Sequence, residues 1–158
     1  MSRDPQPSDA VALSAVLVAT SRLRRATQHG AIPVLRDADL TVPQWLILCH
    51  LRGADGSTLT ETAAAIDHDA GALSRAVYLL RKRELIVALQ VPGDRRSVSL
   101  CISPSGEALC DKVDAQLRGQ MADALDGGMA GPELRMLLHL MDKAVAALSG
   151  PARRPLAS

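Results

Sequence analysis

The chain alternates segments whose apolar residues recur every three or four positions with short stretches rich in Gly, Pro and Asp. This spacing places apolar side chains on one face of an amphipathic helix. The first such segment predicts a long helix over 8–29, which Gly30 and Pro33 are expected to end. A short irregular or helical piece to Asp39 should follow.

Two further helix starts carry capping signals. The segments 41–44 and 58–61 both begin with Thr, and a Gln or Glu stands three residues later. In a capping box the Thr hydroxyl accepts from the third helical N–H, while the Gln or Glu side chain reaches back to the backbone N–H of the Thr. These segments predict helices over 42–51 and 59–66.

A second short helix is predicted to follow directly, capped by Asp69 and reaching about Arg83. Its apolar stripe consists of Leu73, Ala76, Val77 and Leu80. Two short helices joined by a three-residue turn, the second with an exposed basic face, are typical of a helix-turn-helix. The outward face should carry Gly71, Ser74, Arg75, Tyr78, Arg81 and Lys82.

The next segment has the pattern of a β-hairpin. Residues 85–91 are rich in aliphatic and β-branched types, 92–94 is a Pro-Gly-Asp turn, and 97–102 alternates apolar with polar residues. The hairpin tip therefore carries Asp94, Arg95 and Arg96.

Two helices should complete the chain, over 104–126 and 132–148, each with a continuous apolar stripe. No other large domain is available to bury these stripes, and an exposed stripe of that length is a liability in a monomer. We therefore expect a two-fold homodimer. The terminal residues 1–8 and 149–158 are expected to be disordered tails.

Composition supports one globular, mainly α domain with a small β-hairpin. The 158 residues are 47% hydrophobic and 22% charged, and they include no Phe, one Trp and one Tyr. A core of Leu, Ala and Val favours helices over a β-sandwich. The chain has no apolar run long enough to cross a membrane and no signal peptide, so a cytoplasmic location without membrane contact is expected.

Charge is unevenly distributed along the chain. Residues 71–100 carry six Lys or Arg against two acids, whereas 101–150 carry four against seven, although the whole chain has a net charge of only +1. One basic surface on a nearly neutral protein is the pattern expected of a chain that contacts a polyanion with one face.

At this point the sequence resembles the MarR (multiple antibiotic resistance regulator) family of transcription factors, over about residues 9–148. The resemblance implies a winged helix-turn-helix over 40–103, flanked by dimerisation helices over 9–39 and 104–148. It also implies a repressor that binds a palindromic operator in double-stranded DNA as a homodimer and is released by a small aromatic or phenolic acid. The residues that carry it are Leu40-Thr41-Val42-Pro43-Gln44-Trp45, Leu59-Thr60-Glu61, Leu73-Ser74-Arg75, the hairpin from Pro92 to Leu100, and Ser103-Pro104-Ser105-Gly106.

For the recognition helix, the resemblance implies that its N-terminal part enters the major groove, with Arg75 as the candidate for a bidentate guanine contact. The family more often has hydroxyl residues at positions 71 and 72, so Gly71 and Ala72 are expected to allow close approach to the backbone. Arg81, Lys82 and Arg83 are expected to contact phosphate, or to form a solvated charged end.

For the hairpin, the resemblance assigns Arg95 to the minor groove and Asp94 to a salt bridge that orients an arginine. The alternative is a charged surface turn. Glu84 stands where the family commonly has Gly. The candidate DNA-contacting residues are Gly71, Ala72, Ser74, Arg75, Tyr78, Arg81, Asp94, Arg95 and Arg96.

The polar and aromatic groups available for an anionic aromatic effector lie on the first two helices. Trp45 can equally be plain core, and His50 can equally be a histidine satisfied at a helix end. The candidate effector residues are Arg22, Arg25, His29, Trp45 and His50.

Other classes of function find little support in the sequence. The chain has no enzyme motif such as GxSxG or a P-loop, and it needs no cofactor. Its four histidines are scattered singly, which disfavours a metal site, and the three cysteines are interpreted as small buried residues, although Cys101 could be accessible. The remaining alternative is a winged-helix protein-interaction module without DNA binding.

Overall fold

The structure is a computed structural model that describes residues 7–91, 94–126, 128–129 and 131–148. Within these ranges the side chains of 7–12, 91, 94–97, 121 and 123–126 fall outside the description. The chain divides into two compact units, residues 1–118 and 119–158, which are considered separately.

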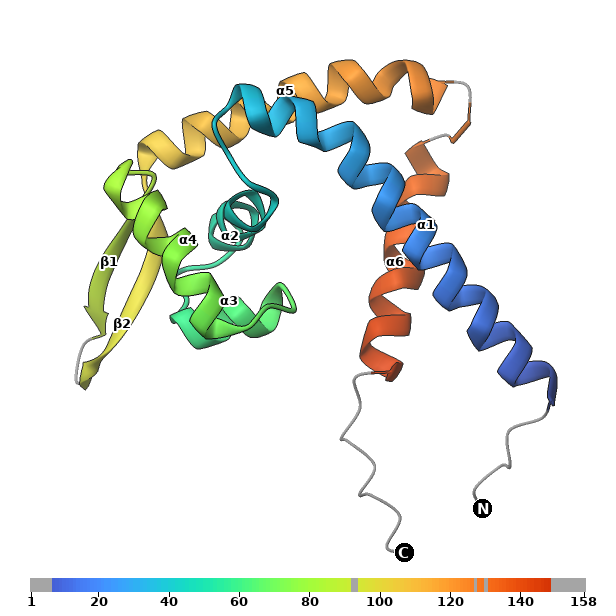
Figure 1. Cartoon of the computed structure of the whole chain (residues 1–158), viewed down its shortest axis with the longest axis horizontal. Coiled ribbons are helices and arrows are strands. Elements are labelled where there is room, and N and C mark those ends of the chain that lie inside the picture. Colours follow the sequence, from blue (N-terminus) through green and yellow to red (C-terminus); the bar gives the residue numbers. More distant parts are fainter. Residues whose placement is uncertain (1–6, 92–93, 127, 130, 149–158) are drawn as a thin grey trace, which may run out of the picture. The chain divides into compact units, whose positions relative to one another are not determined.

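The chain is mainly helical with one two-stranded antiparallel sheet, as the sequence predicted (Figure 1). Along the chain the elements are α1 (Pro7–Asp37), α2 (Val42–Arg52), α3 (Leu59–Ala65), α4 (Ala70–Lys82), β1 (Ile86–Val91), β2 (Asp94–Ile102), α5 (Pro104–Asp126) and α6 (Gly131–Leu148).

The predicted end of the first helix is wrong. Helix α1 continues through Gly30 and Pro33 to Asp37, and it begins at Pro7, inside the segment predicted to be a tail. A proline inside a helix costs about 3 kcal/mol, because it removes one backbone hydrogen bond and crowds the preceding turn. The residues that follow, Val34 and Leu35, are both 2% exposed in the core. Burying two such side chains is worth about 3–6 kcal/mol, which is enough to offset the proline.

The predicted helix starts are confirmed. Both capping boxes form: the N–H of Gln44 donates to the Thr41 hydroxyl and the N–H of Glu61 to the Thr58 hydroxyl, at 3.4 and 3.2 Å. The Asp69 side chain caps α4. These local bonds satisfy N–H groups that a helix cannot pair internally, which is why the starts could be located from sequence.

Three helices of the first unit end with a non-glycine residue in the left-handed region. These residues are Asp39 after α1, Asp67 after α3 and Glu84 after α4, with φ of 53°, 53° and 57°. At the end of α4 the N–H of Leu85 donates to the C=O of Leu80 at 3.0 Å, and bonds of 2.8 and 2.9 Å close the other two ends in the same way. This is the Schellman arrangement, in which glycine usually occupies the left-handed position.

The hairpin is regular at its base and irregular toward its tip. Pairing runs without a break from Ile86 opposite Ile102 to Gln90 opposite Val98, but Val91 then pairs with Asp94. Residues 95–97 of β2 are therefore extra, as in a bulge. At the base, Ser57 forms an isolated bridge with Leu100 through backbone bonds of 3.0 and 2.8 Å. The turn between α2 and α3 thus holds the base of the hairpin.

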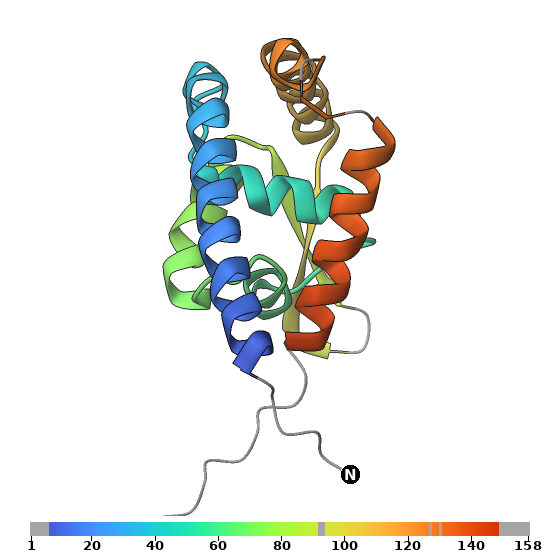
Figure 2. The same cartoon turned by 90° about the vertical axis from the view of Figure 1, so that its right-hand side faces the viewer.

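The hydrophobic core lies in the first unit and joins α2, α4 and the hairpin base to the last turns of α1 and the first turns of α5. Figures 1 and 2 show α2 running through this unit, with the hairpin alongside α4. The buried core residues are Val34, Leu35, Leu40, Ile47, Leu48, Leu51, Ala63, Leu73, Val77, Leu80, Leu85, Ile86, Leu100, Cys110 and Val113.

Candidate nucleic-acid interface

Helix α4 is fixed by one buried face and by a cap at its start. Leu73, Val77 and Leu80 lie in the core, at 1%, 8% and 0% exposed. The Asp69 side chain accepts from the N–H of Ala72 at 2.8 Å. The opposite face of α4 is consequently held in one orientation toward solvent.

The predicted contact residues of α4 lie together on this outer face. All are exposed: Gly71, Ala72, Ser74, Arg75, Tyr78 and Arg81. Neither Arg75 nor Arg81 makes a hydrogen bond or an ion pair within the part of the chain that the structure describes. The Ser74 hydroxyl donates to the Gly71 carbonyl at 2.8 Å, which leaves its oxygen able to accept from a ligand. This face therefore offers guanidinium and hydroxyl groups that are free to bind an external partner.

Gly71 has a local structural role. A Cβ built at this position would lie 3.0 Å from Oδ1 of Asp69, the atom that caps the helix. A larger residue would press on this carboxylate and disturb the cap. The glycine thus keeps the start of α4 narrow as well as capped, which is compatible with the close approach expected from the sequence.

Arg83 makes contacts within the fold that the sequence did not predict. Its guanidinium donates to the backbone carbonyls of Asp39 and Ala38, at 2.5 and 3.1 Å, and lies 3.9 Å from the Asp39 carboxylate. It therefore pairs carbonyls at the end of α1 that the helix leaves free. Sequence reasoning missed this contact because the two partners are 44 and 45 positions away.

The candidate residues of the hairpin tip are only partly covered. The backbone of Asp94, Arg95 and Arg96 belongs to β2, but their side chains lie outside the described residues. The register places Arg95 and Arg96 in the irregular stretch of the strand. Since β1 follows α4 through the tight turn at Glu84, the far end of the hairpin lies toward the start of α4 (Figures 1 and 2).

The five predicted effector residues fall into separate environments. Arg22, Arg25 and His29 line one shallow hollow on the surface of α1. Trp45 is half-buried against the core. His50 lies elsewhere, with Nε2 3.1 Å from the Ser57 hydroxyl oxygen. The described chain alone therefore does not assemble all five into one site.

His50 belongs to a small polar network beneath the hairpin base. The Ser57 oxygen also accepts from the Thr62 hydroxyl at 3.0 Å, and Thr62 is fully buried. Such a network satisfies buried polar groups that would otherwise destabilise the fold. This favours the alternative of a satisfied histidine at a helix end over a ligand-binding one.

Cys49 and Cys110 have thiols with a raised pKa, which makes them poor nucleophiles. The expectation that the cysteines are buried is wrong for Cys49, which is exposed. Partial desolvation nevertheless raises the pKa of its thiol to about 11, and the nearby Cys110 and Asp114 add to this shift while Arg52 opposes it. Burial likewise raises the pKa of Cys110. Since the thiolate is the reactive form, neither residue is set up for redox chemistry at neutral pH.

An ion pair network ties α2 to the start of α5. The Arg52 guanidinium bonds to Asp111 and, at 2.7 Å, to Asp114. The hydrogen bond that Arg52 donates to the Asp114 carboxylate is the main reason that the pKa of Arg52 is raised above its ordinary value. This network is a structural link, and it lies apart from the exposed face of α4.

Within the described residues, no group of three or more His, Cys, Asp or Glu residues is placed to hold a metal ion. No described helix is long and apolar enough to cross a membrane.

Comparison with known proteins gives consistent matches. A family model described as the MarR family matches residues 38–97. The HTH-type transcriptional repressor NicR of Pseudomonas putida is 33% identical over 126 residues, which cover 78% of this chain and 79% of NicR. The multiple antibiotic resistance protein MarR of Escherichia coli is 27% identical over 109 residues, covering 69% and 76% of the two chains.

Solved structures match the fold. A mutant of Escherichia coli MarR complexed with operator DNA has a TM-score of 0.66 and 24% identity, over 89% of this chain and 99% of that one. NadR in complex with 4-hydroxyphenylacetate has a TM-score of 0.71 and 19% identity, over 95% and 96%.

Proposed function

Because the chain belongs to the MarR family of DNA-binding transcriptional regulators, which are not enzymes, we propose that it is a repressor that binds a palindromic operator as a homodimer. We further propose that a small aromatic or phenolic acid releases it from DNA. The observation that carries the proposal is the outer face of α4, where Arg75 and Arg81 are exposed and without partners in the described chain.

In this proposal α4 enters the major groove and the hairpin reaches the adjacent minor groove. Arg75 lies in the second turn of α4, where a guanidinium can reach O6 and N7 of a guanine. Arg95 would enter the minor groove, where narrow A·T-rich sequence concentrates negative potential. Tyr78 and Arg81 lie farther along α4 and would contact the sugar-phosphate backbone.

Exposed apolar side chains support a homodimer. In the single chain, helix α6 has no buried residue, and Leu138, Val145 and Leu148 are 55–67% exposed. Near the start of α1, Leu17 and Val18 are 69% and 59% exposed. Apolar surface of this extent is normally covered by another chain. A two-fold dimer would place two α4 helices about one helical turn apart on a duplex.

Two observations support release by an aromatic acid: a pair of arginines on α1, and a solved relative that contains a phenolic acid. Arg22 and Arg25 lie together on α1, and two guanidinium groups suit a carboxylate. NadR was solved with 4-hydroxyphenylacetate, a phenolic acid. Titration of the protein with 4-hydroxyphenylacetate, followed by Trp45 fluorescence and repeated on Arg25→Gln, tests this step. A signal that is absent, or unchanged in the variant, would count against it.

DNA binding is tested by selecting a duplex from a random library and measuring affinity by mobility shift at fixed salt. Arg75→Ala and Arg95→Ala should each weaken binding by about 1–3 kcal/mol, roughly 5-fold to 150-fold. Only Arg75→Ala should also relax the preference for one base. Lys112→Ala, which removes an exposed charge from α5, serves as the matched control and should leave affinity unchanged.

Two results would refute this assignment. The first is wild-type affinity in both arginine variants, which would show that the surface is misassigned. The second is failure of the protein to bind any duplex at low salt, where phosphate contacts are strongest. That second result would favour a winged-helix module that contacts only proteins.

A further inference from the structure

Strand β1 has one edge that pairs with β2 and one edge to which no strand is paired within the described residues. The direction of its backbone groups follows from the bridge at the hairpin base. Leu100 donates its N–H to Ser57 at 2.8 Å and accepts from the N–H of Ser57 at 3.0 Å, so both of its backbone groups point away from β1. Ala88 stands opposite Leu100 in the register, at a position where β1 and β2 exchange no bonds. Since such positions alternate along an antiparallel pair, the N–H and C=O groups of Ile86, Ala88 and Gln90 point toward the unpaired edge.

This edge lacks the features that usually protect a free strand. Proline, charged side chains and bulges keep edge strands from pairing with other chains. Residues 86–90 contain no proline and no charged residue. Pairing with β2 is also regular up to Gln90, and the shift in register begins only after it. The edge is therefore open to the addition of another strand.

A hollow of about 700 Å³ lies beside this edge, against the last turns of α4. From β1 it is lined by residues of the open edge, and from α4 by side chains of the outer face, among which Tyr78 is 64% exposed. A strand laid along β1 would occupy this hollow. The lining residues are Tyr78, Arg81, Lys82, Glu84, Ile86, Val87 and Ala88.

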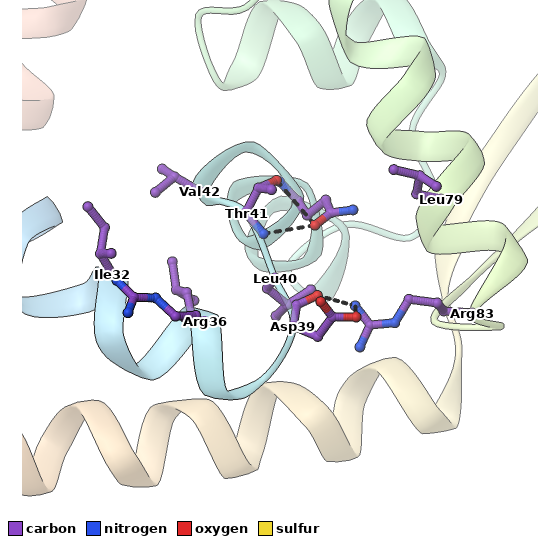
Figure 3. Close-up of a pocket in the computed structure, with 10 residues that line it drawn as sticks. Ile32, Arg36, Asp39, Leu40, Thr41, Val42, Leu79 and Arg83 are labelled. Carbon is purple, nitrogen blue, oxygen red and sulfur yellow. Dashed lines mark hydrogen bonds and ion pairs between the residues drawn. The ribbon is translucent and has the colours of Figure 1, made fainter.

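The charges around the hollow favour an acidic occupant. Arg81 and Lys82 are exposed and make no hydrogen bond or ion pair among the residues that the structure describes. The adjacent Arg83 is turned away, toward carbonyls at the end of α1 (Figure 3). Glu84 is the single acid in the lining. A second copy of the chain is a poor occupant, because residues 71–100 carry six Lys or Arg against two acids and two such segments repel each other.

The two faces of the hairpin determine which side chains an added strand should carry. Ile86 is 2% exposed and faces the core, where α4 packs against β1, and Ala88 shares this face. Val87 and Leu89 point to the other face and are 42% and 54% exposed. An added strand continues both faces, so every second side chain would face α4 and its two free cations. The side chains between them would extend the exposed apolar face.

We propose that the free edge of β1 binds an extended segment of a partner protein in which acidic and apolar residues alternate. The segment adds as an antiparallel strand whose backbone pairs with Ala88, its acids lie against Arg81 and Lys82, and its apolar side chains lie beside Val87 and Leu89. Main-chain bonds supply affinity in this mode, and the alternating side chains supply specificity. A nucleic acid can neutralise the two cations but cannot form the ladder of backbone bonds.

The bound segment would compete with DNA, a step that rests on the proposed function. Tyr78 and Arg81 line the hollow, and they are also the candidate contacts to the sugar-phosphate backbone. Side chains that pair with the acids of the segment are no longer available to phosphate. A partner protein could therefore release the protein from its operator without a small ligand.

The test measures binding by calorimetry on the full chain, with an acetylated and amidated heptapeptide that alternates Glu with Val as the probe. In antiparallel addition the Glu residues stand opposite Ala88 and its edge neighbours, so their backbone N–H groups pair with β1. Methylation of the Glu nitrogens should therefore weaken binding by about tenfold or more, whereas methylation of the Val nitrogens, which point away, should cost less. The same peptide with Lys in place of Glu should not bind.

Variants of the protein test the same contacts from the other side. Ala88→Pro removes an N–H that β2 does not use, at a position where proline is tolerated, and it should weaken peptide binding by about tenfold. Lys82→Gln removes one cation and should weaken it by about threefold. Lys112→Gln, which removes an exposed charge from α5, is the matched control and should bind as the wild type does. Should Ala88→Pro not fold, the methylated peptides and Lys82→Gln still decide.

Several results would overturn the proposal. They are no binding of the Glu peptide, equal binding of its two methylated forms, and wild-type affinity in both Ala88→Pro and Lys82→Gln. A changed oligomeric state of Ala88→Pro in light scattering would assign the edge to a second copy instead. Variants that lose affinity for a duplex but not for the peptide would assign the hollow to DNA.

The outcomes also separate this site from the proposed function. A protein that binds the Glu peptide along β1 but binds no duplex retains the site and loses the proposed function. A protein that binds its operator but not the peptide shows the reverse. Where both bind, the peptide should lower the apparent affinity for the operator in a mobility shift, and the Lys peptide should not.

Discussion

Replacing Glu84 by glycine should stabilise the protein. Glu84 has φ of 57°, a conformation that costs an ordinary residue about 1–2 kcal/mol and costs glycine nothing. Glycine loses about 0.5–1 kcal/mol of this gain, because it makes the unfolded chain more flexible. The carbonyl of residue 84 accepts from the Ser103 hydroxyl at 2.6 Å, and glycine keeps that bond. The net gain in the free energy of unfolding should be about 0.5–1 kcal/mol.

Thermal unfolding followed by circular dichroism measures this gain, with all variants at one concentration because a dimer's Tm depends on it. For a chain of this length, the Tm of Glu84→Gly should rise by about 2 °C. Glu84→Ala is the matched control, since it removes the same exposed side chain but keeps the strained backbone. If Glu84→Ala gains as much as Glu84→Gly, or if neither gains, the explanation through φ is refuted.

Two further predictions concern stability. Gly106→Ala should destabilise the protein by about 3 kcal/mol, because a Cβ there would lie 2.1 Å from the Leu85 carbonyl oxygen. Gly119→Ala, where the added Cβ meets open space, should not destabilise it. Urea unfolding compares the two variants, and equal stabilities would refute the clash. The N–H and hydroxyl of Thr58 donate to the Glu61 carboxylate and hold its pKa below the ordinary value. The charge of Glu61 therefore stabilises the fold at pH values above the usual carboxyl pKa, and this stabilisation is lost as the pH falls through the lowered pKa. Glu61→Gln keeps the cap but not the charge, so its Tm deficit should be larger at pH 7 than at pH 3, and a deficit independent of pH would contradict this.

Sequence predicted best the features that depend on neighbouring residues. The boxes at 41–44 and 58–61 and the cap at Asp69 each join groups three positions apart, so the chain itself displays both partners. The exposed face of α4 could also be predicted from the sequence, because helical periodicity alone separates its buried residues from its exposed ones.

Sequence predicted poorly the features that depend on distant partners. Pro33 looks like a helix end until the burial of Val34 and Leu35 is known. Arg83 looks like a surface cation, because its partners at the end of α1 are far away along the chain. Trp45 and the arginines of α1 could be proposed as one site from sequence, but their separate surroundings appear only in three dimensions.

The division of the hairpin into a regular base and an irregular end has an evolutionary consequence. Residues added or deleted beyond Gln90 and Val98 would leave the base pairing and the anchor between Ser57 and Leu100 intact. Related regulators could therefore change the length of this loop without disturbing the helices behind it. If the hairpin contacts DNA as proposed, small insertions would adapt it to duplexes with differently shaped grooves, while the folding of the remaining scaffold stays under separate selection.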